Sequence, residues 1–115
     1  MKGVFKLITV TYSPKKHQLR IKGHAEYAPK GQDIVCAAAT MIFYNLCQMF
    51  REYDEGKAFC KPPKMQFTSG RACVEVVPRT GYENWIEHDF LFALTGYRLL
   101  MAKFPDRVNL KINQV

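Results

Sequence analysis

The sequence predicts an α+β fold, a small antiparallel or mixed sheet with two helices packed on one face. Short segments rich in β-branched and aromatic residues indicate strands, and two longer segments carry apolar residues at helical spacing. These segments follow one another in the order ββαββα, with room for a short final strand. The 115 residues are enough to bury a core, so we expect a single domain over residues 1–115.

The chain begins with two predicted strands. Residues 4–12 are rich in β-branched and aromatic side chains, and residues 13–18 form a turn in which proline restricts the backbone. In residues 19–24 apolar and polar side chains alternate, as expected for a half-buried strand. This alternation places His24 on the polar face at the strand end, and Gly23 beside it permits a close backbone approach.

A loop and a long helix follow. Proline and glycine mark residues 25–32 as the loop, and Asp33 is a favourable N-cap. Apolar residues then recur at helical spacing as far as Tyr53, after which an Asp-Glu-Gly sequence interrupts the pattern. The residues expected to face the sheet are Ile42, Phe43, Leu46, Met49 and Phe50.

The second half repeats the strand, strand, helix order. Residues 65–67 and 72–77 are typical of two strands joined around Ser69-Gly70. A second helix is predicted over residues 83–104, and residues 108–112 favour the short final strand. The apolar stripe of this helix consists of Ile86, Phe90, Ala93, Leu94, Tyr97, Met101 and Phe104.

Cys36 and His24 are the strongest candidates for catalysis. If Asp33 caps the helix, Cys36 is its third residue, where the positive end of the helix dipole favours a thiolate. His24 lies on the other side of the same loop, and an imidazole within reach would complete a nucleophile–base pair. A lone cysteine at an apolar helix start is more often a core residue, so the pairing with His24 carries the hypothesis of a cysteine hydrolase. Asp33 is a further candidate, although capping is its commoner role.

Two further expectations concern how such a site would bind a peptide. Amides of the first helical turn, near Cys36 and Ala37, are candidates to stabilise an oxyanion. The peptide itself is expected to lie along the strand that ends at His24.

Other kinds of site lack a sequence pattern. Cys47, Cys60 and Cys73 are interpreted as structural, and no Cys-x-x-Cys spacing indicates a zinc or redox motif. The two serines lie outside a Gly-x-Ser-x-Gly motif, and no glycine-rich phosphate loop is present. We therefore expect neither a metal nor any other cofactor.

The chain is basic, with a net charge of +7. Lys15, Lys16, Arg20 and Lys22 can form a stripe along the first hairpin, so contact with RNA or the ribosome stays open as an alternative function. No apolar run is expected to reach the length of a membrane span, and the N-terminus lacks a signal-peptide pattern. We therefore expect a cytoplasmic protein without membrane contact.

The stretch around the candidate pair closely resembles the signature of a known family. Gly23-His24-Ala25 followed by Gly31-x-Asp33-Ile34-Val35-Cys36-Ala37-Ala38 resembles the motif of the ribosomal-processing cysteine protease family, Prp. The spacing between histidine and cysteine, the strand–loop–helix context and the chain length also match. The second helix, ending in Phe104-Pro105-Asp106, is similar to the C-terminal end of that family.

The resemblance implies a function. Members of the family are small α+β homodimers that remove an N-terminal extension from a large-subunit ribosomal protein. They cut after an aromatic residue and use a cysteine–histidine pair. By this resemblance Cys36 is the nucleophile, His24 the general base, and Asp33 a supporting residue.

The same resemblance assigns roles to the loop. Gly23 and Gly31 match motif glycines and would supply backbone freedom, and residues 25–35 would form a mobile cover that orders on peptide binding. Thr40 stands where the family more usually has serine, and residues 54–64 match no family feature. A phage-borne or divergent relative that processes another protein, and an assembly dimer without activity, therefore remain alternatives.

Overall fold

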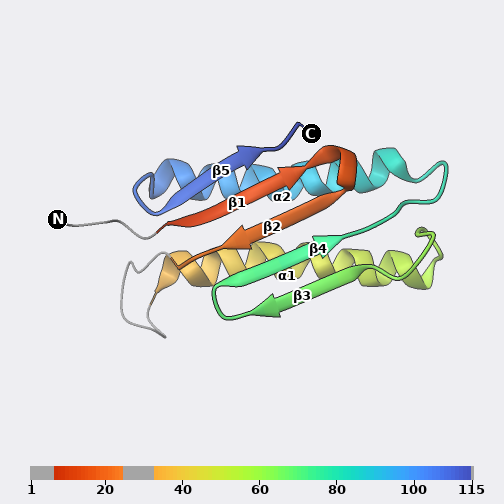
Figure 1. Ribbon diagram of the computed structural model, residues 1–115, viewed down its shortest axis with the longest axis horizontal. Coiled ribbons are helices and arrows are strands. Elements are labelled where there is room, and N and C mark those ends of the chain that lie inside the picture. The colour runs from red at the N-terminus through yellow and green to blue at the C-terminus, as the bar shows by residue number, and fades with distance from the viewer. Residues whose placement is uncertain (1–6, 25–32, 115) are drawn as a thin grey trace.

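The computed structural model describes residues 7–24 and 33–114. In chain order its elements are β1 (Ile8–Ser13), the 3-10 helix η1 (Pro14–Lys16), β2 (Gln18–Lys22), α1 (Ile34–Glu55), β3 (Lys64–Thr68), β4 (Arg71–Glu75), α2 (Glu83–Lys103) and β5 (Val108–Ile112) (Figure 1). This order confirms the predicted ββαββα arrangement, including the short final strand.

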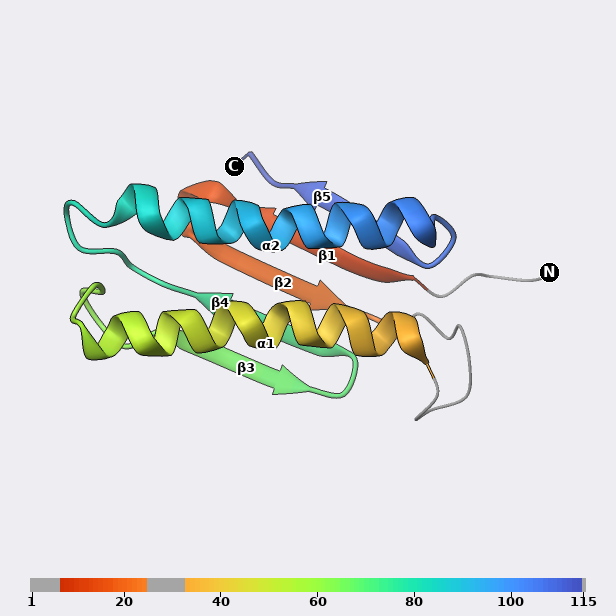
Figure 2. The same ribbon diagram turned by 180° about the vertical axis from the view of Figure 1, so that it is seen from behind.

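The five strands form one mixed sheet in the order β3-β4-β2-β1-β5. Neighbouring strands are antiparallel except β1 and β5, which pair in parallel at one edge. Both helices lie on the same face of the sheet, and they run antiparallel to each other (Figure 2). The predicted α+β architecture, with two helices on one face, is therefore confirmed.

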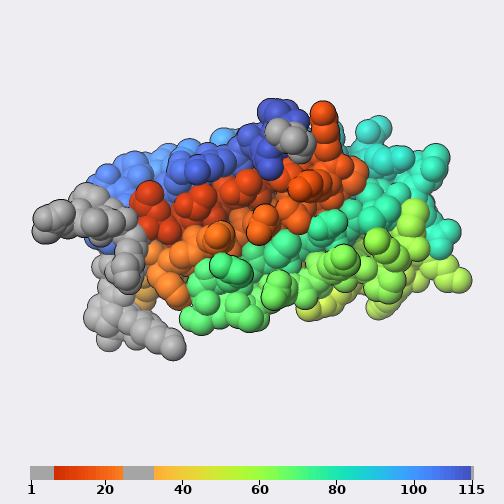
Figure 3. Space-filling view, viewed as in Figure 1, coloured from red at the N-terminus to blue at the C-terminus, as the bar shows by residue number. Residues whose placement is uncertain are grey.

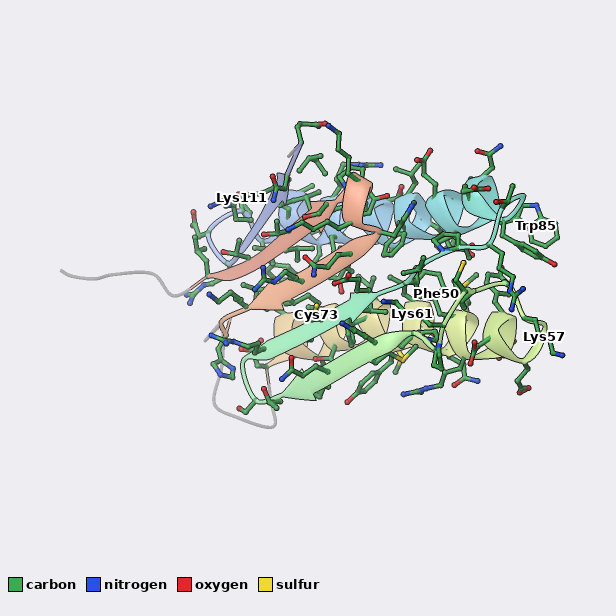
Figure 4. The ribbon with its side chains drawn as sticks, turned by 45° about the vertical axis from the view of Figure 1, so that its right-hand side comes forward. Phe50, Lys57, Lys61, Cys73, Trp85 and Lys111 are labelled. Carbon is green, nitrogen blue, oxygen red and sulfur yellow. The ribbon has the colours of Figure 1, made fainter. Side chains whose placement is uncertain are left out.

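Alternation along the strands separates a core face from an open face. On β2, Leu19 and Ile21 are buried beneath the helices, whereas Arg20 and Lys22 are exposed. Phe50 of α1 is completely buried between the helices and the sheet, and its ring lies 5.1 Å from that of Phe90 (Figure 4). Burial of large aromatic side chains like these is the main force that holds the helices against the sheet.

Two contacts fix the helices relative to each other. The buried hydroxyl of Tyr97 on α2 donates a hydrogen bond to the Ala39 carbonyl of α1, at 2.9 Å. Gly96 lies against Ile42, where a Cβ would approach the Ile42 side chain to 3.1 Å. The absence of a side chain at residue 96 therefore allows the two helices to approach closely.

The sequence predicted no secondary structure for the connector between α1 and β3. Lys57 adopts a left-handed conformation at φ 62°, after which Ala58 and Phe59 turn into the core. Phe59 forms a β-bridge with Pro78, and the Cys60 amide donates to the Val77 carbonyl at 2.8 Å. The segment is thus held to the chain that leaves β4, which connects the two halves of the fold.

Several element boundaries differ from the prediction. The turn after β1 is a 3-10 helix, closed by His17 in a left-handed conformation at φ 49°. β2 ends at Lys22, so His24 follows the strand instead of ending it. α1 continues past Tyr53 to Glu55, which is within the one or two residues by which helix ends usually vary. The start of the first predicted strand, residues 4–6, lies outside the described residues.

α1 meets the length and composition criterion for a membrane-spanning helix. This corrects the expectation that no apolar run is long enough. The buried face of α1 packs on the sheet, and core helices of soluble proteins meet the same criterion, so one such helix is weak evidence for a membrane span.

Candidate active site

A pocket of about 950 Å³ opens where the start of α1, the end of β2 and the β3–β4 turn come together. It brings together the predicted residues His24, Cys36 and Asp33. In the chain, His24 precedes the undescribed segment, residues 25–32, and the other two residues follow it. Its described lining consists of Ile21, Gly23, His24, Asp33, Cys36, Ala37, Ala39, Thr40, Met41, Tyr44, Phe67, Thr68, Ser69, Gly70, Arg71 and Ala72.

Cys36 is the third residue of α1, as predicted, and its side chain is half-buried. The first turn of a helix concentrates unpaired N–H groups and partial positive charge, which favour a thiolate over a thiol. Thr40, one turn later on α1, lines the same pocket. The helix therefore presents Cys36 to the pocket at the position where its dipole acts most strongly.

Asp33 is the N-cap of α1. Its Oδ1 accepts hydrogen bonds from the amides of Val35 and Cys36, each at 3.0 Å. The predicted capping role is therefore confirmed. The cap also ties the backbone of the nucleophile candidate to the helix start, so Asp33 helps to hold Cys36 in place.

The capping interaction corrects the expected oxyanion donors. The Cys36 amide donates to the Asp33 side chain, and the Ala37 amide donates to the Asp33 carbonyl at 3.0 Å. Both amides are engaged inside the helix start, so they are not available to an oxyanion while the cap is intact.

His24 is exposed and lies against the β3–β4 turn. Gly23 adopts φ +97°, and its amide donates to the Gly70 carbonyl at 2.8 Å. A Cβ placed on Gly70 would lie only 2.6 Å from His24 Nε2. The imidazole therefore rests directly on the backbone of Gly70, whose own φ of +74° also favours glycine.

A peptide that follows the predicted path along β2 cannot add to it as a further strand. β2 is paired with β4 on one side and with β1 on the other, so its backbone groups are already used. The sheet edge nearest the pocket is β3, since Phe67 and Thr68 line the pocket and β3 ends the strand order. An extended peptide can add only to an edge strand of this kind.

One side of the pocket is aromatic, which was not predicted from the sequence. Tyr44 of α1 and Phe67 of β3 are each about half exposed, and their ring centroids lie 5.0 Å apart. Met41, on the preceding turn of α1, is also exposed and lines the pocket. The signal available in the sequence was that Met41 and Tyr44 fall outside the predicted core stripe of α1.

The other cysteines are in different environments. Burial raises the pKa of Cys47 to about 11, and burial also raises the pKa of the half-buried Cys73 thiol. Neither residue lines the pocket. Cys60 is exposed, and its Sγ lies 3.6 Å from the Pro78 carbonyl oxygen. A structural role as a buried residue therefore holds for Cys47 but not for Cys60.

Parts of the predicted loop are outside the described residues. Gly31 and the rest of residues 25–32 belong to this undescribed part. The predicted cover cannot extend to residue 35, because Ile34 and Val35 form the first turn of α1 and Val35 is completely buried. Among the described residues, no group of three or more His, Cys, Asp or Glu side chains is placed to hold a metal ion.

Comparison with known proteins identifies related sequences. The family model described as cysteine protease Prp matches residues 7–83. A stretch of 50 residues, 44% of this chain, is 40% identical to the ribosomal processing cysteine protease Prp of Mycoplasma genitalium. That match spans 40% of the length of the Mycoplasma protein.

Solved structures with the same fold are also known. The essential ribosomal processing protease Prp of S. aureus, in complex with a covalently linked product peptide, matches with a TM-score of 0.75 and 17% identity over 93% of this chain and 100% of that chain. The protein SMU.848 of Streptococcus mutans matches with a TM-score of 0.67 and 21% identity, over 98% of this chain and 97% of its own. These likenesses show a common fold.

Proposed function

Because the chain belongs to the cysteine protease Prp family, we propose that it is a cysteine endopeptidase with Cys36 as nucleophile and His24 as general base. The observation that carries this proposal is the shared pocket, which both side chains line from different elements. The family model covers both residues, since it matches residues 7–83.

The reaction follows the usual chemistry of a cysteine–histidine pair. His24 accepts the proton of the Cys36 thiol, and the thiolate attacks the carbonyl carbon of the scissile bond. The imidazolium then returns this proton to the leaving amine as the C–N bond breaks, which leaves a thioester on Cys36. Water, deprotonated by His24, attacks the thioester and releases the carboxylic acid, and the proton goes back to the Cys36 sulfur.

We propose that the substrate is a precursor of a large-subunit ribosomal protein, cut after an aromatic residue of its N-terminal extension. The exposed rings of Tyr44 and Phe67 and the side chain of Met41 offer an apolar surface on which such a residue can pack. The related S. aureus protease was solved with a substrate peptide and with a product peptide. The alternative substrate is another precursor protein, such as a phage structural protein, which the same pocket could admit.

Other properties belong to the same proposal. The enzyme works as a single domain over residues 1–115, as a homodimer, in the cytoplasm and without a metal or other cofactor. Asp33 supports the site through the backbone of Cys36.

Peptide cleavage tests the nucleophile. Wild-type protein should cleave the precursor at one bond, identified by N-terminal sequencing of the product, and Cys36→Ser should lose about 10⁴-fold or more in kcat/KM. His24→Ala should lose activity as well. Cys60→Ser is the matched control, because it removes an exposed thiol outside the pocket and should leave cleavage unchanged.

Thiol labelling provides a second, independent measurement. In the Cys60→Ser background at pH 7, iodoacetamide should modify Cys36 first. Cys47 should react slowly, and faster only as the pH rises toward its pKa of about 11. Equal labelling of Cys36 and Cys47, or normal cleavage by Cys36→Ser, would contradict the proposed mechanism. Cleavage of only a non-ribosomal precursor would retain the mechanism and replace the substrate.

A further inference from the structure

The face of the sheet opposite the helices is open. Figure 1 shows the strands in front of both helices, and Figure 3 shows their side chains forming this surface with no helix across it. The alternate strand residues that do not face the helices make up what we call the open face. It consists of Thr9, Thr11, Gln18, Arg20, Lys22, Lys64, Gln66, Thr68, Arg71, Cys73, Glu75, Asn109 and Lys111.

The open face concentrates the positive charge of the chain. The five strands contain five basic residues and one acid, Glu75, and all six lie on the open face. This surplus of four positive charges is more than half of the net charge of +7. All five basic side chains are exposed. Of the basic stripe predicted along the first hairpin, Arg20 and Lys22 belong to this wider surface, whereas Lys15 and Lys16 lie in η1.

The pairing of the strands leaves much of this charge uncompensated. Lys22 lies directly opposite Arg71 on the neighbouring strand, an arrangement that destabilises a sheet because like charges repel. Glu75 lies opposite Lys64, and its Oε1 accepts a hydrogen bond from Gln18 at 2.8 Å. Glu75 thus offsets the positive charge of Lys64 at the β3 edge of the open face, and the centre of the face stays positive.

A row of paired open-face residues that includes Arg20 runs across the sheet to β5. Thr11 of β1 lies between Arg20 on β2 and Lys111 on β5, each of which is its direct neighbour on the adjacent strand. On the far side of Arg20, its direct neighbour is Cys73 on β4. Gln66 on the edge strand β3 lies opposite Cys73 and ends the row on that side. Figure 4 labels Cys73 on β4 and Lys111 on β5. Cations here alternate with small hydroxyl and thiol side chains.

The composition of the open face selects the kind of partner. It carries no aromatic or aliphatic side chain, whereas protein interfaces and membrane-inserting surfaces use such residues as anchors. Proteins that bind single-stranded nucleic acid also need aromatic rings on which bases stack. Lysine, arginine, threonine, asparagine and glutamine are instead the residues that contact phosphate oxygens and ribose hydroxyls.

We propose that the open face binds the sugar–phosphate backbone of double-helical RNA. The choice of RNA over DNA rests on the proposed function, because a ribosomal precursor protein is encountered together with RNA. The surface continues into the active site, since Arg71 belongs to the open face and also lines the pocket. RNA bound here would hold a ribosomal substrate with its extension close to the pocket.

Binding of a model duplex tests the proposal. The probe is a labelled RNA duplex of about 20 base pairs, longer than the roughly 16 base pairs spanned by a common duplex-binding domain. Fluorescence anisotropy should detect binding that weakens steeply as KCl is raised. Arg20→Gln/Lys111→Gln should lower the affinity on the order of tenfold and reduce the slope of log K against log salt by about 2.

The matched control removes the same charges elsewhere. Arg51→Gln/Lys103→Gln changes one arginine and one lysine that are exposed on the two helices, and it should bind the duplex nearly as well as wild type. Equal weakening in both double variants, or no binding by wild type at low salt, would overturn the proposal. Tighter binding of the single strand would overturn the duplex assignment, and equal binding of a DNA duplex would overturn the choice of RNA.

Cleavage of a short peptide tests the proposed protease function independently of the proposed RNA binding. Arg20 and Lys111 do not line the pocket, so their double variant should retain wild-type kcat/KM on a peptide free of RNA. If wild type binds the duplex but cleaves no precursor, the proposed protease function fails while RNA binding stands. If it cleaves but does not bind, only the RNA proposal fails.

Discussion

Gly70 and Gly81 are two glycines in left-handed conformations that differ in their surroundings. Gly70 has φ +74°, and an added Cβ would lie 2.6 Å from His24 Nε2. Gly81 has φ +99°, and an added Cβ would meet nothing within 4 Å. Alanine at either position brings backbone strain of roughly 1–2 kcal/mol, but only alanine at 70 must push the imidazole aside.

We therefore expect Gly70→Ala to reduce kcat/KM strongly, whereas Gly81→Ala retains wild-type activity. Urea unfolding should show a similar loss of stability in both variants, which isolates the displacement of His24 as the cause. Equal activities in the two variants would contradict the role of Gly70 in positioning His24.

Asp89 is a buried carboxyl group whose Oδ2 has no hydrogen-bond partner among the described residues. Burial raises its pKa above the usual value, and a hydrogen bond from Tyr53 opposes this only in part. Because the folded state binds the proton more tightly than the unfolded state, the contribution of Asp89 to stability falls as the pH rises from about 3.9 through the raised pKa.

Asp89→Asn should remove this dependence, because an amide of the same shape does not ionise. The stability of wild type relative to Asp89→Asn, measured by urea unfolding from pH 4 to pH 7, should decrease steadily as the pH rises. A difference that stays constant over this range would show that the carboxyl group titrates as it does in the unfolded chain.

At the scale of the element, the start of α1 serves both folding and the site. The Asp33 carboxylate accepts from the Val35 and Cys36 amides, and a lost N-cap typically costs about 1 kcal/mol. Asp33→Ala should therefore destabilise the protein by about this amount and lower activity by loosening Cys36. Asp33→Asn keeps a capping oxygen but removes the charge.

If Asp33 acts only as a cap, Asp33→Asn should keep nearly wild-type stability and kcat/KM. Thermal unfolding and peptide cleavage measured on both variants separate the two roles. A large loss of activity in Asp33→Asn at unchanged stability would show that the charge itself supports the reaction.

The two helices and the N-cap of α1 were predictable because their signals are local. Helical spacing of apolar residues and a single Asp at the start suffice to predict α1, and the same spacing predicts α2. An N-cap side chain commonly accepts from the third helical amide, so even the engagement of the Cys36 amide had a local signal. The contact of His24 with Gly70 had none, because it depends on the register that pairs β2 with β4. The exclusion of strand addition to β2 had no local signal either, since strand order decides which strands are edges.

At the scale of the whole molecule, the sheet layer and the helix layer expose surfaces of different chemical character. The open face of the sheet is charged, whereas the outer surface of the helices carries exposed apolar residues. Trp85, Phe92 and Leu99 are 64%, 75% and 63% exposed and follow one another at seven-residue intervals along α2. Figure 2 shows α2 in front of the sheet, and Figure 4 labels Trp85 near the start of the helix. This spacing places the three side chains in a row on one side of the helix, as in helices that pack against another helix.

The proposed homodimer can use this row, because a second copy brings the same apolar row and both become buried. Phe92→Glu would place a charge at the centre of the contact and should yield a monomer of 13.3 kDa by light scattering after size-exclusion chromatography. Arg98→Glu is the control, since it adds an acid on the same helix at an exposed position outside the row. Wild type and the control should both elute at twice the monomer mass. If Phe92→Glu stays dimeric, the copies pair through another surface, and if wild type is itself a monomer, the proposed dimer is wrong.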